Sequence, residues 1–302
     1  MKAVWPAVVA QFAVKHGDPP GRGAAVLGMG SLGAGQLQAG SDLDLIVIYD
    51  ADGVEASDGR RPLAARPYYA RLTQALVTAM TAPMADGRLY EVDMRLRPSG
   101  RQGPVATGFA SFQAYQRDEA WTWEHLALTR ARPIAGPEDL MDEIEAFRAH
   151  LLAEVGASDT VKADVLEMRA RIAEAKGPGG PFEAKLGAGR MQDIELTAQA
   201  AALVAGDTRR DTAAQLGCGV AIGWWTDADV SDLCRTYGLL WALQAASKLV
   251  VDGAFDPATA GEGARRFILR ETGVSDVADL ENRIAQVAGT AAAVIARSLE
   301  RP

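Results

Sequence analysis

The sequence predicts an α+β fold, with a mixed sheet and its helices first and a helical bundle after it. Two observations predict this order. In the first 136 residues, short apolar runs typical of strands alternate with helical patterns. From about Asp139 onward the patterns are helical, after a stretch with Pro133, Gly136 and Pro137 that is typical of a boundary. We therefore predict one domain over residues 1–136 and a helical bundle domain over residues 137–302.

Composition limits the classes of protein and partner. The chain has 302 residues, and 48% of them are hydrophobic, which is enough for a sizeable core. Its net charge of −8 argues against nucleic acid as a partner and favours a protein or small-molecule substrate. Cys218 and Cys234 are the only cysteines, without C-x-x-C spacing, which indicates reduced thiols and a cytoplasmic location. The N-terminus does not resemble a signal peptide, and no apolar run approaches the length of a membrane span.

The first domain is organised around residues 24–50, AAVLGMGSLGAGQLQAGSDLDLIVIYD, which follow a predicted helix over residues 2–16. The stretch reads as a buried strand, a glycine-rich turn and a second apolar strand. Gly30 and Ser31 follow the first strand directly, so bare backbone amides and a hydroxyl can approach a triphosphate there. The turn is therefore a candidate nucleotide-binding element, although a Gly-Ser pair alone is usually only a turn.

Two aspartates begin the second strand. Asp42 and Asp44 are two residues apart, so their side chains point to the same face. Carboxylates side by side repel each other unless a hard cation lies between them, which suits magnesium. Alone, this pattern is more often a solvated strand end. Its spacing from the Gly-Ser turn favours a metal site. The following residues 45–48 are all apolar, which predicts a central strand covered on both faces.

A third acid is predicted further along the chain. A helix is expected over Tyr68–Ala82, followed by a half-buried strand in LYEVDMRLRPSG, where apolar and charged residues alternate. Asp93, Arg95 and Arg97 lie on its polar face, as a site for a metal-bound triphosphate needs. The alternative is an ordinary amphipathic strand with ion pairs across the sheet.

The rest of the chain supplies helices and weaker candidates. We expect one helix over Phe109–Leu128, whose aromatic residues are assigned to the core, and Arg130 and Arg132 rank below Arg95 and Arg97. The three histidines are too scattered for a metal cluster. In the second half, helices are predicted over residues 139–155, after a Ser158 or Asp159 cap, from about residue 191, and over residues 230–251 and 277–299.

Four stretches resemble the bacterial glutamine synthetase adenylyltransferase/adenylyl-removing enzymes, which are polymerase-beta-like nucleotidyltransferases. They are residues 28–50, YEVDMRLRPSGRQGPV, AWTWEHLALTRARPIAG and KLGAGRMQDIE, so the resemblance covers most of residues 24–200. The second and third are more similar to the C-terminal, adenylylating half of that family. Two positions depart from it: many members have lysine where Ser31 stands and glycine where Arg190 stands.

This resemblance implies a fold, a reaction and a set of roles. The first domain would have the polymerase-beta-like fold, and the chain would transfer AMP from ATP to a tyrosine hydroxyl of glutamine synthetase, which inactivates it. Two Mg²⁺ ions would be held by Asp42, Asp44 and Asp93, and Asp93 would also take the phenolic proton. The residues implied in nucleotide binding are Gly30, Ser31, Arg95, Arg97 and Lys185. The resemblance also implies the PII signal protein as regulator, and neither nucleic acid nor a membrane as partner.

Three alternatives remain open at this point. The chain could be the adenylyl-removing half, which uses the same aspartates to cleave the tyrosyl-AMP link with phosphate and release ADP. It could be a non-catalytic module that senses nucleotide. It could also be a small-molecule nucleotidyltransferase of the antibiotic-modifying kind, which the long second and third stretches disfavour.

Overall fold

In the computed structural model, which describes residues 1–85, 87, 90–158, 160–176 and 179–300, the chain divides into two compact units. The first unit contains residues 1–37 and 41–154, and the second contains residues 38–40 and the chain from Val155 onward. This division falls near the end of helix α6 (Glu138–Gly156), whereas the predicted domains divide before that helix. The domain boundary itself stays a prediction.

The first unit contains the mixed sheet. Its five strands are β1 (Gly23–Gly28), β2 (Leu43–Asp50), β3 (Val92–Asp93), β4 (Thr107–Gly108) and β5 (Arg132–Ala135). The order is β3-β2-β1-β5, and β4 also pairs with β2. β1 runs antiparallel to β2 and β5, whereas β3 and β4 run parallel to β2. β2 is therefore the central strand that its apolar residues predict.

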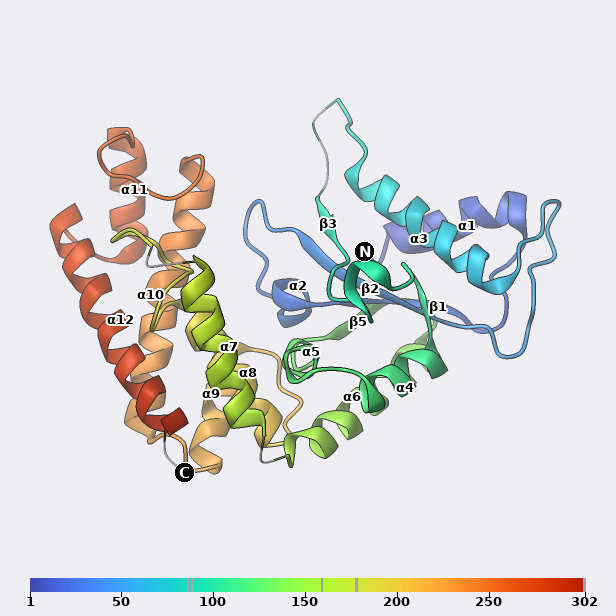
Figure 1. The fold of residues 1–302 in the computed structure, drawn as a ribbon. Coiled ribbons are helices and arrows are strands. Elements are labelled where there is room, and N and C mark those ends of the chain that lie inside the picture. Colours follow the sequence, from blue (N-terminus) through green and yellow to red (C-terminus); the bar gives the residue numbers. More distant parts are fainter. Residues whose placement is uncertain (86, 88–89, 159, 177–178, 301–302) are drawn as a thin grey trace. The chain divides into compact units, whose positions relative to one another are not determined.

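Helices cover both faces of this sheet. They are α1 (Val4–His16), α2 (Gly30–Ala34), α3 (Ala65–Thr81), α4 (Phe109–Asp118), α5 (Thr122–Leu128) and the first part of α6, with a 3₁₀ turn η1 (Gly100–Gln102) between β3 and β4. Helices α1 and α3 lie on one face, and α4, α5 and α6 lie on the other (Figure 1). The predicted helices over residues 2–16 and 68–82 are confirmed as α1 and α3.

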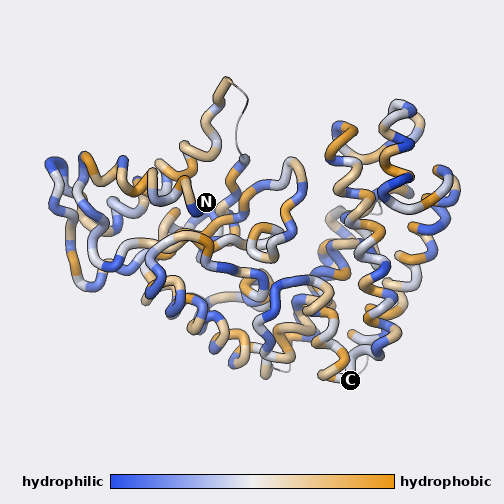
Figure 2. Tube along the Cα trace, turned by 180° about the vertical axis from the view of Figure 1, so that it is seen from behind, coloured by the Kyte–Doolittle hydropathy of each residue, from blue (hydrophilic) through white to orange (hydrophobic). Residues whose placement is uncertain are grey.

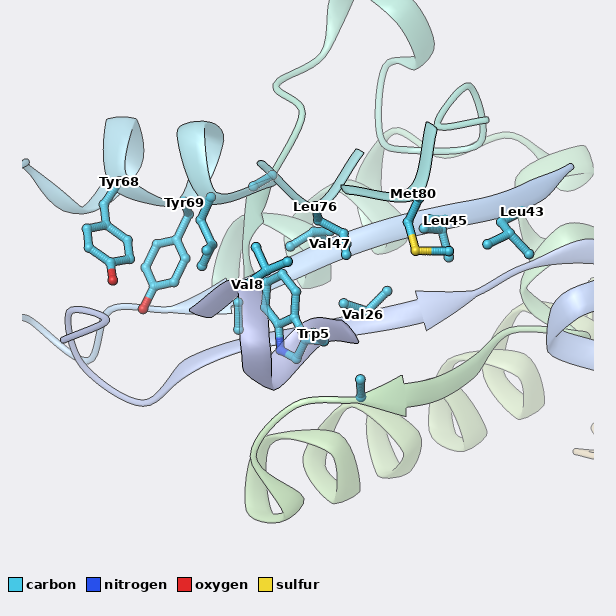
Figure 3. Packing of buried hydrophobic residues seen from close by; sticks show 14 residues of the cluster. Trp5, Val8, Val26, Leu43, Leu45, Val47, Tyr68, Tyr69, Leu76 and Met80 are labelled. Carbon is cyan, nitrogen blue, oxygen red and sulfur yellow. The ribbon is translucent and has the colours of Figure 1, made fainter. Parts of the chain in front are cut away.

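The hydrophobic core under α1 and α3 determines on which face of the sheet the Asp44 side chain lies. Leu43, Leu45 and Val47 of β2 are buried in one cluster with Leu76 and Met80 of α3 (Figure 3). Side chains alternate along a strand, so the even-numbered residues of β2 point to the opposite face. The Asp44 side chain therefore leaves the sheet on the side away from α1 and α3.

Two sequence predictions about the first unit are wrong. The strand expected in LYEVDMRLRPSG is limited to Val92–Asp93, because the chain then turns and the Arg97 amide donates to the Met94 carbonyl at 3.3 Å. The single helix expected over Phe109–Leu128 is two helices. The break lies at Trp121, whose backbone amide donates to the buried Glu124 carboxylate at 3.0 Å. Trp121 is 69% exposed and Trp123 is also exposed, so neither belongs to the core.

Every described element after α6 is a helix. These elements are α7 (Val161–Lys176), α8 (Met191–Val204), α9 (Thr212–Ala221), α10 (Asp227–Val250), α11 (Glu262–Thr272) and α12 (Val277–Glu300). Helix α8 contacts α7, α9, α10 and α12, and its small residues Ala198, Ala200 and Ala201 are fully buried, which lets these neighbours approach closely. Hydrophobic and hydrophilic residues alternate along the helices, as the coloured tube shows (Figure 2).

Four of these helices, α7, α8, α10 and α12, were expected from the sequence, whereas α9 and α11 were not. Of the two residues proposed to cap α7, Asp159 lies outside the described residues, and the Ser158 hydroxyl lies 3.0 Å from that of Thr160. No helix in the described part of the chain combines the length and hydrophobicity needed to cross a membrane.

The packing of α3 on the sheet supports β2, so its loss should destabilise the first unit. We expect Leu76→Ala to lower the free energy of unfolding by about 2–5 kcal/mol, because it leaves a cavity beside β2. Thr78→Ala, on the exposed side of the same helix, should change it by about 0.5 kcal/mol or less. Urea unfolding of both variants measures the difference. Equal effects would contradict the assignment of Leu76 to the core.

Candidate functional site

The glycine turn after β1 is folded against the side chain of Asp44. The Met29 amide donates to the Asp44 carbonyl at 2.8 Å, which ties the turn to the start of β2. Gly30 has φ of +51°, and a Cβ built on it would lie 2.6 Å from Asp44 Oδ2. A side chain at position 30 would therefore strain the backbone and displace the carboxylate. Glycine is required here because the backbone and an acidic side chain approach each other closely.

Helix α2 is held against β5 by a second glycine. A Cβ at Gly33 would collide with the carbonyl oxygen of Arg130, so only glycine permits this approach. Arg132 Nε donates to the Gly33 carbonyl at 2.8 Å. These contacts fix the turn that carries Ser31, which is partly exposed. Sequence reasoning gave Gly33 no role, although its position three residues after Gly30 was a visible signal.

Strand β3 brings the third predicted acid to the same place. β2 and β3 are parallel, and their register pairs Asp44 with Asp93. Directly paired residues of adjacent strands point to the same face of the sheet. Asp42 precedes Asp44 by two residues and is exposed. The backbone thus places Asp44 and Asp93 next to each other, on the face that faces away from α1 and α3.

Arg95 supplies the positive charge among these acids. The Asp93 carboxylate accepts hydrogen bonds from the Arg95 backbone amide at 2.8 Å and from its Nε at 2.6 Å, and it also forms an ion pair with Nη2. The side-chain hydrogen bond from Arg95 holds the pKa of Asp93 below its usual range. Asp93 is the main cause that raises the pKa of Arg95, and the charges of Asp44 and Asp42 raise it further. One guanidinium is thus stabilised by all three carboxylates.

Arg97 is arranged differently from Arg95. Its guanidinium donates to three backbone carbonyls of its own loop: Met94 at 2.7 Å, Arg101 at 3.2 Å and Gly103 at 3.3 Å. These bonds support the turn after β3. Lys185 belongs to the second unit, where it is exposed and its backbone amide donates to Glu183 Oε1 at 2.7 Å. Nucleotide binding by Arg97 and Lys185 stays a prediction.

The donor atoms at this place suit a hard cation. Among the described residues, no group of three acidic, histidine or cysteine side chains has the spacing of a metal site, and the Asp93 carboxylate is hydrogen-bonded to Arg95. The acids nevertheless offer only oxygen atoms, the ligands that magnesium prefers. The Gly30 backbone lies close to the Asp44 carboxylate, and the Arg95 guanidinium is a positive charge near the same acids. Magnesium binding by these residues therefore stays a prediction.

A mixed sheet with a glycine turn against paired aspartates is consistent with a nucleotidyltransferase domain followed by helices. Comparison with protein families supports this class. Residues 1–147 match the family model for glutamate-ammonia ligase adenylyltransferase, and residues 160–295 match the model for GlnD PII-uridylyltransferase. The first part of the chain is thus similar to the glutamate-ammonia ligase adenylyltransferase family, and the resemblance predicted from its motifs is confirmed.

Curated relatives extend the similarity over nearly the whole chain. The relative from Agrobacterium fabrum is 40% identical over 94% of this chain and 30% of its own length. Those from Rhizobium meliloti and Xanthobacter autotrophicus are 43% and 39% identical, over 91% and 99% of this chain and 29% and 31% of theirs. Each is a bifunctional glutamine synthetase adenylyltransferase/adenylyl-removing enzyme. The chain spans about 30% of the length of these nucleotidyltransferase enzymes.

The ion pair between Asp93 and Arg95 predicts how the Asp93 carboxylate titrates. Arg95→Met should raise the pKa of Asp93 toward the ordinary value of about 3.9, because the main hydrogen-bond donor to the carboxylate is removed. Carboxyl-carbon NMR titration measures this pKa. Arg101→Met, which removes a smaller electrostatic contribution, should raise it less. The pair stabilises the fold above the unfolded pKa of about 3.9, and this stabilisation is lost as the pH falls through the lower native pKa.

Proposed function

We propose that this chain transfers AMP from ATP to a tyrosine hydroxyl of glutamine synthetase and thereby inactivates it. The observation that carries the proposal is the register of β2 and β3, which pairs Asp44 with Asp93 beside the glycine turn. It occurs in a chain whose first 147 residues match an adenylyltransferase family model and whose relatives are named for this reaction. The proposal includes the polymerase-beta-like fold and the equivalence to the adenylylating half.

The residues take distinct parts in the reaction. Asp42, Asp44 and Asp93 would hold two Mg²⁺ ions, which supply positive charge to the triphosphate and lower the pKa of the tyrosine hydroxyl when bound. The backbone at Gly30 and the Ser31 hydroxyl contact the triphosphate. Asp93 accepts the phenolic proton, the phenolate oxygen bonds to the α-phosphorus, and the bond to pyrophosphate breaks.

Arg95 has two successive partners in this proposal. In the structure its guanidinium is bound to Asp93, and its side chain is 64% exposed, so it can leave this partner without disturbing the core. With Asp93 holding Mg²⁺, Arg95 would be free to pair with the negative charge of the triphosphate. Arg97 and Lys185 have secondary roles in binding nucleotide.

The proposed partners and location follow from the same similarity to adenylyltransferases. Glutamine synthetase is the protein substrate, as the names of the relatives indicate for those enzymes. The PII signal protein is the expected regulator. The similarity of residues 160–295 to a PII-uridylyltransferase model supports a link of that second part to PII. The two cysteines are free in the structure, which agrees with the proposed cytoplasmic location.

Transfer of a labelled nucleotide tests the proposal directly. The chain is incubated with unmodified glutamine synthetase, Mg²⁺ and ATP labelled at the α-phosphate. We expect label on a synthetase tyrosine, and losses of several orders of magnitude for Asp44→Asn and Asp93→Asn. The circular dichroism spectra of these variants should match the wild type. Near-normal transfer by Asp93→Asn would remove this residue from the mechanism.

The same assay separates the alternatives. If no label is transferred, and phosphate releases ADP from adenylylated synthetase, the chain corresponds to the adenylyl-removing half. If neither reaction occurs and Mg²⁺-dependent ATP binding is absent as well, the chain is a non-catalytic module. Transfer of label to an aminoglycoside would instead support the small-molecule enzyme.

Two glycines offer a matched pair of variants for the turn. Gly30 and Gly35 both have positive φ, +51° and +76°, so alanine at either position should cost about 1–2 kcal/mol of stability. Only the methyl group at position 30 meets the Asp44 carboxylate, since a Cβ at Gly35 has no atom within 4 Å. We expect Gly30→Ala to lower transfer about 100-fold and Gly35→Ala to leave it nearly unchanged. Equal activities of the two variants would contradict the role of this contact.

A further inference from the structure

The second unit contains a cavity that the proposed reaction does not use. Its volume is about 370 Å³, within the range of small-molecule sites. It lies between α7, the loop before α8 and the first turns of α8. The side chains that matter for its chemistry are Arg169, Ile172, Leu186, Arg190, Gln192 and Leu196.

One of the two arginines at this cavity is neutralised. Arg169 donates from Nε to Asp193 Oδ1 at 2.6 Å and from Nη2 to Oδ2 at 3.0 Å, a two-point ion pair. Asp193 Oδ2 also accepts the Gly189 amide at 2.8 Å. Both oxygens of the carboxylate are therefore engaged, and Asp193 offers little to a second cation.

The other arginine has no such partner. Arg190, the residue directly before α8, forms no ion pair with the described residues, and its Nη1 is buried without a hydrogen-bond acceptor. Burial lowers the pKa of its guanidinium, and the charge of Glu183 opposes this shift only in part. Glu183 Oε1 is engaged by the backbone amides of Lys185 and Leu186, at 2.7 and 3.1 Å. Arg190 is half-buried, and a partly desolvated charge without a partner is costly, so its place at a cavity calls for an explanation.

Close packing of the loop before α8 holds the Arg190 side chain in position. A Cβ at Gly187 would lie 3.2 Å from Arg190 Cδ, so the side chain packs closely against the bare backbone of the loop. A Cβ at Gly189 would collide with the carbonyl of Ala288 on α12, which fixes the loop against that helix. Gln192 Oε1 is a second buried polar atom without a hydrogen-bond partner at the same end of α8.

We propose that this cavity binds a small oxyanion, a phosphate or a carboxylate, whose charge is met by the Arg190 guanidinium. The amino-terminal end of the 14-residue helix α8 adds a favourable electrostatic field for an anion. Ile172, Leu186 and Leu196 give the cavity apolar walls that suit a short hydrocarbon group attached to the anion. The site lies within the second unit and needs none of the residues proposed for AMP transfer.

Calorimetric titration of the whole chain with two probes tests the site. Inorganic phosphate represents one source of the oxyanion, and propionate represents a carboxylate with an apolar tail. We expect saturable binding of at least one probe at pH 7, at least tenfold weaker in Arg190→Met and within a few-fold of wild type in Arg190→Lys. Binding of phosphate alone or of propionate alone identifies the source.

A control variant separates this site from general attraction of anions. Arg171 lies on α7, is exposed and pairs with Glu167, so Arg171→Met removes one positive charge away from the cavity and should not change binding. The proposal is overturned if the wild type shows no saturable binding of either probe, or if Arg190→Met binds as well as the wild type. Neither result depends on AMP transfer, so failure of the proposed reaction would leave this test valid.

Stability provides a second measurement for the same site. Without added anion, Arg190→Met should be at least as stable to urea as the wild type, because it removes a half-buried charge whose Nη1 lacks a hydrogen-bond partner. The bound probe should raise the Tm of the wild type and not that of Arg190→Met. A clear loss of stability in Arg190→Met, with no rise of the wild-type Tm, would show that the guanidinium is structural.

Discussion

The pairing of β3 with β2 is the constraint on which the candidate site depends. It sets Asp44 and Asp93 side by side, and two carboxylates in neighbouring positions repel each other unless a positive charge lies close to them. Arg95 provides that charge from the turn that follows β3. The glycine turn after β1 has to pass the same carboxylate, which explains why position 30 cannot carry a side chain.

Arg95 and Arg190 show two ways in which a protein holds a guanidinium near a candidate site. Arg95 is largely exposed and bound to Asp93, so a change of partner costs little burial. Arg190 is partly buried and has no ion pair with the described residues, so its charge gains most from a partner that enters from outside the chain. The first arrangement suits a residue that moves during a reaction, and the second suits a fixed binding site.

Sequence reasoning predicted the features that depend on local pattern. Strands β1 and β2 and the turn at Gly30 follow from apolar runs and glycine, whereas β2 begins at Leu43, so the shared face of Asp42 and Asp44 stays a prediction. The alternating pattern of the sequence continues beyond Asp93, but the chain already turns there, and Arg97 donates hydrogen bonds to carbonyl groups of this turn. The aromatic composition of a segment likewise does not show whether a given side chain points to the core or to solvent. Trp121 is exposed, at the position where the expected helix breaks.

The cavity at α8 shows why some of the site chemistry lies beyond the sequence. Arg190 was visible only as a departure from a family pattern, and an arginine in a glycine-rich loop is normally solvated. Its surroundings include the close approach of α12 to Gly189 and the ion pair of Arg169 with Asp193. Both are contacts between residues far apart in the chain. Because Arg169 occupies Asp193 and backbone amides engage Glu183, the charge of Arg190 is left for a ligand.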